Sequence, residues 1–118
     1  MTEEEFEAVV EAAVRNLPRR FRGLLDNVII TVKERPTRAQ DRRYGRGLMG
    51  LYEGVPLAER GQGYSGAMPD KITLFRENLD YGRAGRKAVA ARVRHTLLHE
   101  LAHHFGMDDE ELLEKGLY

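Results

Sequence analysis

The sequence HELAHHFGMDD at residues 99–109 contains three of the four histidines of this chain. On an α-helix, His99 and His103 lie one turn apart on the same face, which is the geometry in which two imidazoles can bind one zinc ion. Glu100 follows the first histidine, where its carboxylate can reach a metal-bound water without becoming a ligand and can act as general base. This spacing predicts zinc ligation by His99 and His103 and a catalytic role for Glu100.

A glycine follows the second histidine after three residues and is expected to end the helix. Gly106 allows the backbone to turn through positive φ, so that the next segment can return toward the metal. Hydrolytic zinc sites use three protein ligands and keep a fourth position open for water, which makes Asp109 the predicted third ligand. Asp108 is the alternative ligand, and helix capping is the alternative role for either aspartate.

The helix that carries the motif is expected to run from Arg86 to about Phe105. Its apolar face, predicted to pack in the core, consists of Val89, Val93, Leu97 and Leu101, flanked by Leu98 and Phe105. The opposite face carries Arg92, His95, His99 and His103. This separation favours the metal interpretation, because a structural histidine would more often lie within the apolar stripe.

The other two histidines are expected to have different roles. His104 projects between two residues of the apolar stripe, so packing with a hydrogen bond is a better prediction than ligation. His95 shares the face of the ligands but lies about 12 Å along the helix axis from His103, so it cannot bind the same ion. Solvent exposure and a contact to substrate are the two interpretations of His95.

Helical and strand patterns elsewhere predict an α+β fold. Thr2 and Glu5 form a capping-box pattern, and the apolar spacing that follows predicts a helix that ends before Pro18. The run at residues 28–32 predicts a central strand, residues 48–52 a second strand, and the alternation at residues 71–75 a half-buried or edge strand. Residues 21–25 are expected to form a short apolar turn, and residues 108–113 a short C-terminal helix.

Two segments show no periodicity and are interpreted as loops. Residues 36–47 carry arginines beside Tyr44, a combination that can contact phosphate and stack a base, but a mobile solvated loop is the favoured interpretation because the chain has no net charge. Residues 54–70 contain GxGxxG at 61–66, which we interpret as coincidental since no helix pattern opens from it. This second segment is expected to be flexible and could cover the site.

Composition limits the class of protein. The chain has 118 residues, 19 basic and 19 acidic side chains, and no cysteine. This fits a single domain over residues 1–118, gives no electrostatic case for nucleic acid, and leaves only nitrogen and oxygen ligands for a metal. The acidic start of the chain and the absence of a long apolar run indicate a cytoplasmic protein without membrane association.

The motif residues carry a resemblance to a known family. The pattern HExxHxxGxxD at 99–109 resembles zincin-type metallopeptidases whose third ligand is aspartate, and more closely a small bacterial family of minimal zincin-like predicted metallopeptidases. The similarity extends to LYEG at 51–54, PLAERG at 56–61, residues 69–75 and residues 99–112. It implies a small mixed sheet packed on an N-terminal helix and on the motif helix, with an edge strand that can pair with an extended substrate. The substrate of such proteins is undefined.

The predicted function is zinc-dependent hydrolysis of peptide bonds in extended or unfolded polypeptide, with a metal-activated water and Glu100 as base. One alternative is a zinc-stabilised binding module without turnover. A small metal-dependent ribonuclease is the other, although Glu100 and Asp109 depart from its histidine pattern. The sequence does not select the group that stabilises the oxyanion, nor the oligomeric state; the candidates for the first are Tyr44, Tyr52, Tyr64, Tyr118, His95 and Arg92.

Overall fold

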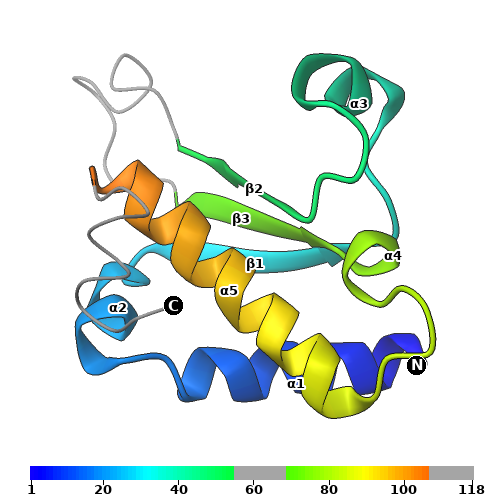
Figure 1. The fold of residues 1–118 in the computed structure, drawn as a ribbon. Coiled ribbons are helices and arrows are strands. Elements are labelled where there is room, and N and C mark those ends of the chain that lie inside the picture. The colour runs from blue at the N-terminus through cyan, green and yellow to red at the C-terminus, as the bar shows by residue number, and fades with distance from the viewer. Residues whose placement is uncertain (55–68, 107–118) are drawn as a thin grey trace.

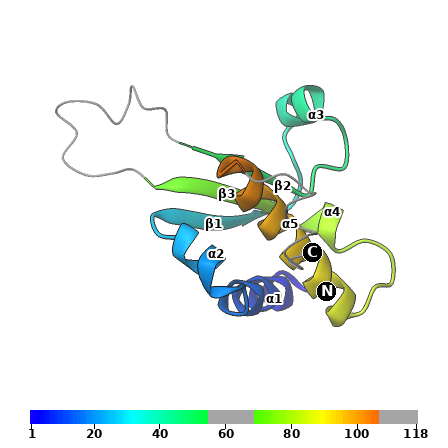
Figure 2. The same cartoon turned by 60° about the vertical axis from the view of Figure 1, so that its left-hand side comes forward.

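The computed structural model describes residues 1–54 and 69–106 and has an α+β fold, as predicted. In chain order its elements are α1 (Glu3–Arg15), α2 (Arg19–Leu24), β1 (Val28–Lys33), α3 (Arg38–Tyr44), β2 (Gly50–Glu53), β3 (Asp70–Phe75), α4 (Arg76–Leu79) and α5 (Arg86–His104). The helices α1, α2 and α5 pack against a three-stranded sheet (Figures 1 and 2). The expected C-terminal helix and the GxGxxG segment lie outside the described residues.

Helix α1 forms where the capping pattern predicts it. The Thr2 side chain accepts a hydrogen bond from the backbone N–H of Glu5 at 3.1 Å, and acidic residues in the first turn suit the helix dipole. Phe6, Val9 and Val10 are buried at helical spacing against the sheet. The helix ends at Arg15, before Pro18, because a proline inside it would remove a hydrogen bond and clash with the preceding turn.

Helix α5 is the longest element and presents the predicted apolar face to the core. That face is fully buried and consists of Val89, Val93, Leu97, Leu98 and Leu101. The inclusion of Phe105 was wrong, since this side chain is 45% exposed. The regular helix ends at His104 and Phe105 is its C-cap, so helical spacing no longer determines which way the Phe105 side chain faces.

The order of strands in the sheet is β1-β3-β2 and differs from the prediction. The strand β3 is central, parallel to β1 and antiparallel to β2, so the assignment of residues 28–32 as central and of residues 71–75 as edge was wrong. On β1, alternate residues pack on the core while Ile29 is 52% exposed. Its apolar run therefore belongs to an edge strand with one covered face.

Two segments predicted as irregular are helical. At the start of α3, the Thr37 side chain accepts from the Gln40 N–H at 3.1 Å, and the Gln40 side chain accepts from the Thr37 N–H at 2.9 Å. This capping box satisfies the first turn, so the helix forms although it buries no side chain and has no apolar period. The apolar turn at residues 21–25 is the short helix α2, which buries Phe21.

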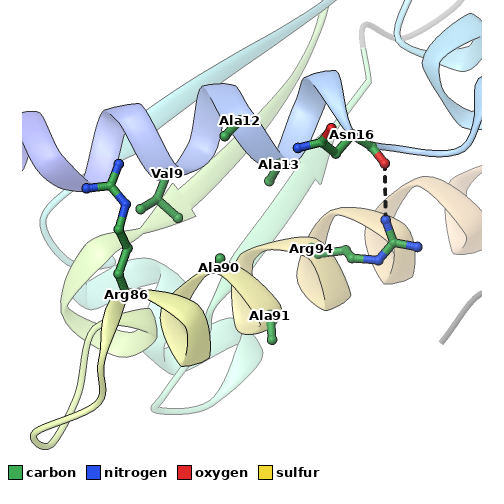
Figure 3. Close-up of a pocket in the computed structure, with 8 residues that line it drawn as sticks. All are labelled: Val9, Ala12, Ala13, Asn16, Arg86, Ala90, Ala91 and Arg94. Carbon is green, nitrogen blue, oxygen red and sulfur yellow. Dashed lines mark hydrogen bonds between the residues drawn. The ribbon is translucent and has the colours of Figure 1, made fainter.

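Small side chains line the space between α1 and α5. Figure 3 shows Ala13 on the side of α1 toward Ala90, with Arg94 donating to the backbone oxygen of Asn16 at 3.3 Å. A groove of about 250 Å³ remains between the two helices. By helical spacing, the groove lies on the side of α5 away from His99 and His103.

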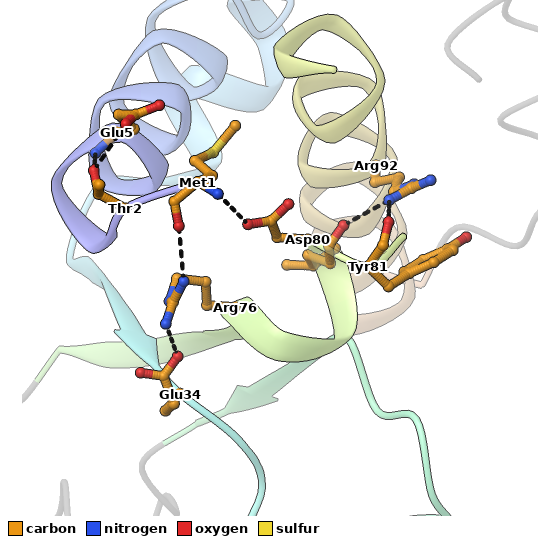
Figure 4. A network of polar contacts seen from close by, with 9 residues as sticks. Met1, Thr2, Glu5, Glu34, Arg76, Asp80, Tyr81 and Arg92 are labelled. Atoms are coloured by element: carbon orange, nitrogen blue, oxygen red, sulfur yellow. Dashed lines mark hydrogen bonds and ion pairs between the residues drawn. The ribbon is translucent and has the colours of Figure 1, made fainter. Parts of the chain in front are cut away.

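Arginines connect the segments at the other end of α5 (Figure 4). Arg76 donates to the backbone oxygen of Met1 at 3.1 Å and forms an ion pair with Glu34. Arg92 donates to the backbone oxygens of Leu79 and Tyr81, at 3.0 and 3.2 Å, and its guanidinium lies 3.7 Å from the centre of the Tyr81 ring. These contacts hold α4 and the turn before α5, which gives Arg92 a structural role and removes it from the oxyanion candidates.

Gly50 permits β2 to approach α5, and its replacement by alanine is predicted to destabilise the fold. A Cβ at position 50 would lie 2.6 Å from the Thr96 methyl carbon, on a buried and β-branched side chain in α5. We expect Gly50→Ala to lower the free energy of unfolding by about 1–3 kcal/mol in urea titrations.

The control is Gly23→Ala in α2, where nothing lies within 4 Å of the added carbon. This variant is expected to keep or slightly raise stability, because alanine restricts the unfolded chain. Equal stability of the two variants would contradict the close approach of β2 to α5.

Candidate metal centre and active site

His99 and His103 meet on the last two turns of α5, as their spacing predicts. Their ring centroids are 4.1 Å apart, with an angle of 49° between the ring planes. His99 is half-buried and His103 is exposed, so one ring faces the protein and the other the solvent. Two imidazoles this close can donate nitrogen atoms to one ion, and this donor set suits zinc.

The described residues do not show a third side chain grouped with the two histidines. Within residues 1–54 and 69–106, no three side chains of the ligand types are grouped to hold a metal. Gly106 does end α5 with φ of 80°, and its N–H donates to the backbone oxygen of His103 at 3.2 Å. The chain therefore turns where the third-ligand hypothesis requires, while Asp108 and Asp109 lie outside the described residues and their ligation stays a prediction.

Glu100 lies half-buried between α5 and β2. Burial raises the pKa of its carboxyl above the ordinary value of 4.5, and three weaker influences lower it: the charge of His99, a hydrogen bond from the backbone of Tyr52, and the charge of His103. A carboxylate that is partly removed from water is a better proton acceptor than an exposed one. The site thus holds Glu100 in an environment suited to a general base.

A cluster of three side chains joins the end of α5 to the sheet. The Tyr52 ring stacks on His104 at 3.8 Å between centroids, and the Tyr52 hydroxyl donates to an Asp70 carboxylate oxygen at 2.7 Å. The same oxygen lies 3.8 Å from His104 Nε2. The prediction for His104 is only partly confirmed: its ring packs, but on Tyr52 of an edge strand and not within the apolar stripe, its contact to Asp70 is 3.8 Å long, and 38% of its side chain is exposed.

Asp70 was missed by the sequence analysis. Its role depends on the register of the sheet, which sets the first residue of β3 beside β2 and the end of α5. No local sequence pattern predicts the contact between Asp70 and Tyr52. Because the Tyr52 hydroxyl is bonded to Asp70, Tyr52 is a weaker candidate for stabilising an oxyanion.

A cavity of about 370 Å³ opens beside the histidines. One wall is the face of α5 with His95, His99 and Glu100, and the other is the segment that includes Tyr44, Arg46 and Met49. His95 is exposed, and its ring centroid lies 6.2 Å from that of His99. Of the oxyanion candidates within the described part of the chain, Tyr44 and His95 border this cavity.

The site resembles a zincin centre, and comparison with known proteins gives the family. A family model described as zincin-like metallopeptidase matches residues 25–117, which is most of the chain. The chain belongs to this family. No curated protein matches it. Membership of this family of metallopeptidases implies a metal-dependent hydrolase.

Across residues 1–54 and 69–106, no helix has the length and apolar character needed to cross a membrane.

The burial of Glu100 predicts a pH-dependent cost in stability of the metal-free protein. At a pH above the raised pKa the carboxylate is charged in both states and is partly desolvated only when folded, so Glu100→Gln should raise the free energy of unfolding. Below 4.5 the carboxyl is neutral in the folded and the unfolded chain, and the difference should disappear. Urea titrations in chelator at about pH 7 and about pH 4 measure this.

Glu11→Gln provides the matched control, because Glu11 is exposed on α1. It should change stability little at either pH. A less stable Glu100→Gln protein at neutral pH would show that the hydrogen bond and the histidine charges outweigh desolvation.

Proposed function

We propose that this chain is a zinc-dependent peptidase that cleaves extended or unfolded polypeptide, with His99, His103 and Asp109 as metal ligands. The observation that carries the proposal is the position of half-buried Glu100 between two converging histidines and the edge strand β2. Membership of the zincin-like metallopeptidases supports it. The absence of cysteine is in keeping with the cytoplasm as its compartment.

Glu100 serves as general base and then as general acid. When bound, a zinc ion supplies a Lewis acid that lowers the pKa of water and polarises a carbonyl. The carboxylate of Glu100 accepts a proton from the attacking water and delivers it to the amine as the peptide C–N bond breaks. The hydrogen bond from the Tyr52 backbone orients this carboxylate.

The strand β2 is the proposed binding edge for substrate, in place of residues 71–75. Among the described residues, β2 pairs with a strand on one side only. The Met49 backbone oxygen accepts from the Phe75 N–H at 3.0 Å, so alternation along an antiparallel ladder turns the backbone groups of Gly50 and Tyr52 away from β3. The Tyr52 backbone already hydrogen-bonds Glu100, so the Gly50 N–H and C=O are the groups proposed to pair with substrate. A peptide that extends along this side of β2 lies next to Glu100, which favours unfolded substrates.

Stabilisation of the oxyanion is assigned to Tyr44 or His95, since both border the cavity beside Glu100. Tyr44 is 46% exposed, and its hydroxyl can approach a carbonyl oxygen in the cavity. His95 is the alternative donor from the helix side.

The binding-module alternative requires zinc but no base, whereas the ribonuclease alternative requires an RNA surface. The half-buried carboxylate of Glu100 favours hydrolysis over a purely structural metal, because a structural site gains nothing from a desolvated charge. The metallopeptidase family favours a peptide substrate over RNA.

Zinc binding is predicted to depend on the histidine pair and on Asp109. Elemental analysis of the purified protein should give one zinc ion per chain. His99→Ala, His103→Ala and Asp109→Ala should each lose most of this metal, because three ligands are the minimum for a hydrolytic site. His95→Ala and Asp108→Ala are the controls and should retain it. If Asp108→Ala loses zinc and Asp109→Ala retains it, the third ligand is Asp108 and not Asp109.

Glu100→Gln is predicted to bind zinc normally and to lose peptide hydrolysis. The amide occupies the same volume but cannot accept the proton of water, so turnover of an unfolded casein substrate should fall at least about a hundredfold. Retained zinc with normal turnover would remove Glu100 from the mechanism. Retained zinc without turnover in the wild-type protein would favour the binding module.

A further inference from the structure

Positive charge is concentrated beside the cavity in a chain that has no net charge. The segment from α3 to β2 carries one acid, Asp41, and four arginines: Arg38, Arg42, Arg43 and Arg46. All four arginines are exposed. We refer to Arg42, Arg43 and Arg46, the three nearest to β2 in sequence, as the arginine wall.

The arginine wall reaches the proposed reaction centre through Arg46. Arg46 and Tyr44 line the same cavity as His99 and Glu100, although they come from opposite sides of it. Figure 1 shows α3 beyond the end of β1, with the chain returning from it directly into β2. A peptide that lies along β2 and extends across the cavity therefore passes Arg46, and Arg42 and Arg43 lie in the last turn of the helix just before it.

The charges of the arginine wall are not neutralised within the described part of the chain. There, arginines in other places form ion pairs: Arg35 with Glu77 at 3.1 Å, and Arg76 with Glu34. No such pair involves the arginine wall, and its one other contact of note is the Arg43 guanidinium, 5.4 Å from the centre of the Tyr44 ring. Three cations without an acidic partner among the described residues are thus exposed to solvent, and one of them, Arg46, lines the cavity.

Helix stability explains only part of this arrangement. Arg42 and Arg43 occupy the last turn of α3, where cations interact favourably with the helix dipole. Arg46 lies beyond the C-cap Gly45, whose φ is 87°, and the chain there has left the helix. Since α3 buries no side chain, these residues are not required by the core.

We propose that the arginine wall selects substrates with glutamate or aspartate side chains next to the scissile bond. The proposal rests on the proposed function, because the peptide edge at β2 determines which substrate residues reach the cavity. Carboxylates on the peptide replace the ion pairs that the arginine wall lacks, and the guanidinium groups can bind them with two hydrogen bonds. The preferred substrate is therefore an extended acidic polypeptide.

Peptide is favoured over nucleic acid as the occupant of this surface. The positive patch is short, the chain is neutral, and Tyr44, the exposed aromatic side chain in the patch, already has Arg43 beside its ring. Nucleic-acid surfaces combine longer basic tracks with several stacking platforms. Binding of RNA is nevertheless a defined outcome of the experiment.

The experiment measures binding separately from turnover. Zinc-loaded Glu100→Gln protein is titrated into two fluorescein-labelled unstructured peptides that differ only in glutamate or glutamine at the residues flanking the centre. Fluorescence anisotropy should show about tenfold tighter binding of the glutamate peptide at low ionic strength, a preference that declines as salt is added. Adding Arg42→Gln, Arg43→Gln and Arg46→Gln together should abolish the preference.

The control is Arg19→Gln with Arg20→Gln, which removes exposed charge from α2 at the opposite end of β1 (Figure 1). This protein should retain the full preference, and circular dichroism should show that both sets of variants are folded. Equal affinity for the two peptides, or a preference that survives loss of the arginine wall, would overturn the proposal. Tight binding of a single-stranded RNA that also requires the arginine wall would overturn it in favour of a nucleic-acid surface.

Failure of the proposed function gives a different result. If wild-type protein cleaves neither peptide but binding still depends on charge and on the arginine wall, hydrolysis is refuted and the acidic selectivity stands. If wild-type protein cleaves both peptides with equal kcat/KM, the selectivity is refuted and hydrolysis stands.

Discussion

The close packing of β2 against the C-terminal half of α5 is the interaction on which the site depends. It places Gly50 against Thr96, directs the Tyr52 backbone to Glu100 and stacks the Tyr52 ring on His104. The first of these contacts requires the absence of a side chain, and the other two require a register between strand and helix. Because β2 is also paired with β3, the sheet and the motif helix are held as one unit.

This packing also explains why the ionised carboxylate of Glu100, the candidate base, lowers the stability of the folded protein. A carboxylate between a helix and a strand loses hydration, and the histidine charges and one backbone hydrogen bond compensate only in part, since the pKa of Glu100 is raised. Such local destabilisation is common at sites where chemistry needs a group that the fold would not otherwise place there. The rest of α5 offsets the cost with an uninterrupted buried face from Val89 to Leu101.

Charged side chains are also distributed unevenly over the molecule. Acidic residues gather in the first turn of α1, where they stabilise the helix, and arginines gather between α3 and β2, where no packing requires them. The chain has no net charge, but its positive and negative side chains are therefore concentrated in different places. Residues 36–47 were interpreted as a mobile loop because they lack periodicity, and the capping box of Thr37 and Gln40 and the helix α3 contradict that interpretation.

The sequence by itself determined the elements whose information is local. Helical periodicity and terminal residues predict the buried face of α5, the start of α1 and the turn at Gly106. Each is found where it was predicted, except that the buried face stops short of Phe105. Only the tertiary structure decided that β3 is central, that β2 is the edge beside Glu100, and that Asp70 bonds Tyr52. The order of strands depends on which of several segments, far apart in the chain, pair with one another. An alternating pattern shows that a strand has a covered face, but the pattern carries no record of which strands lie on either side.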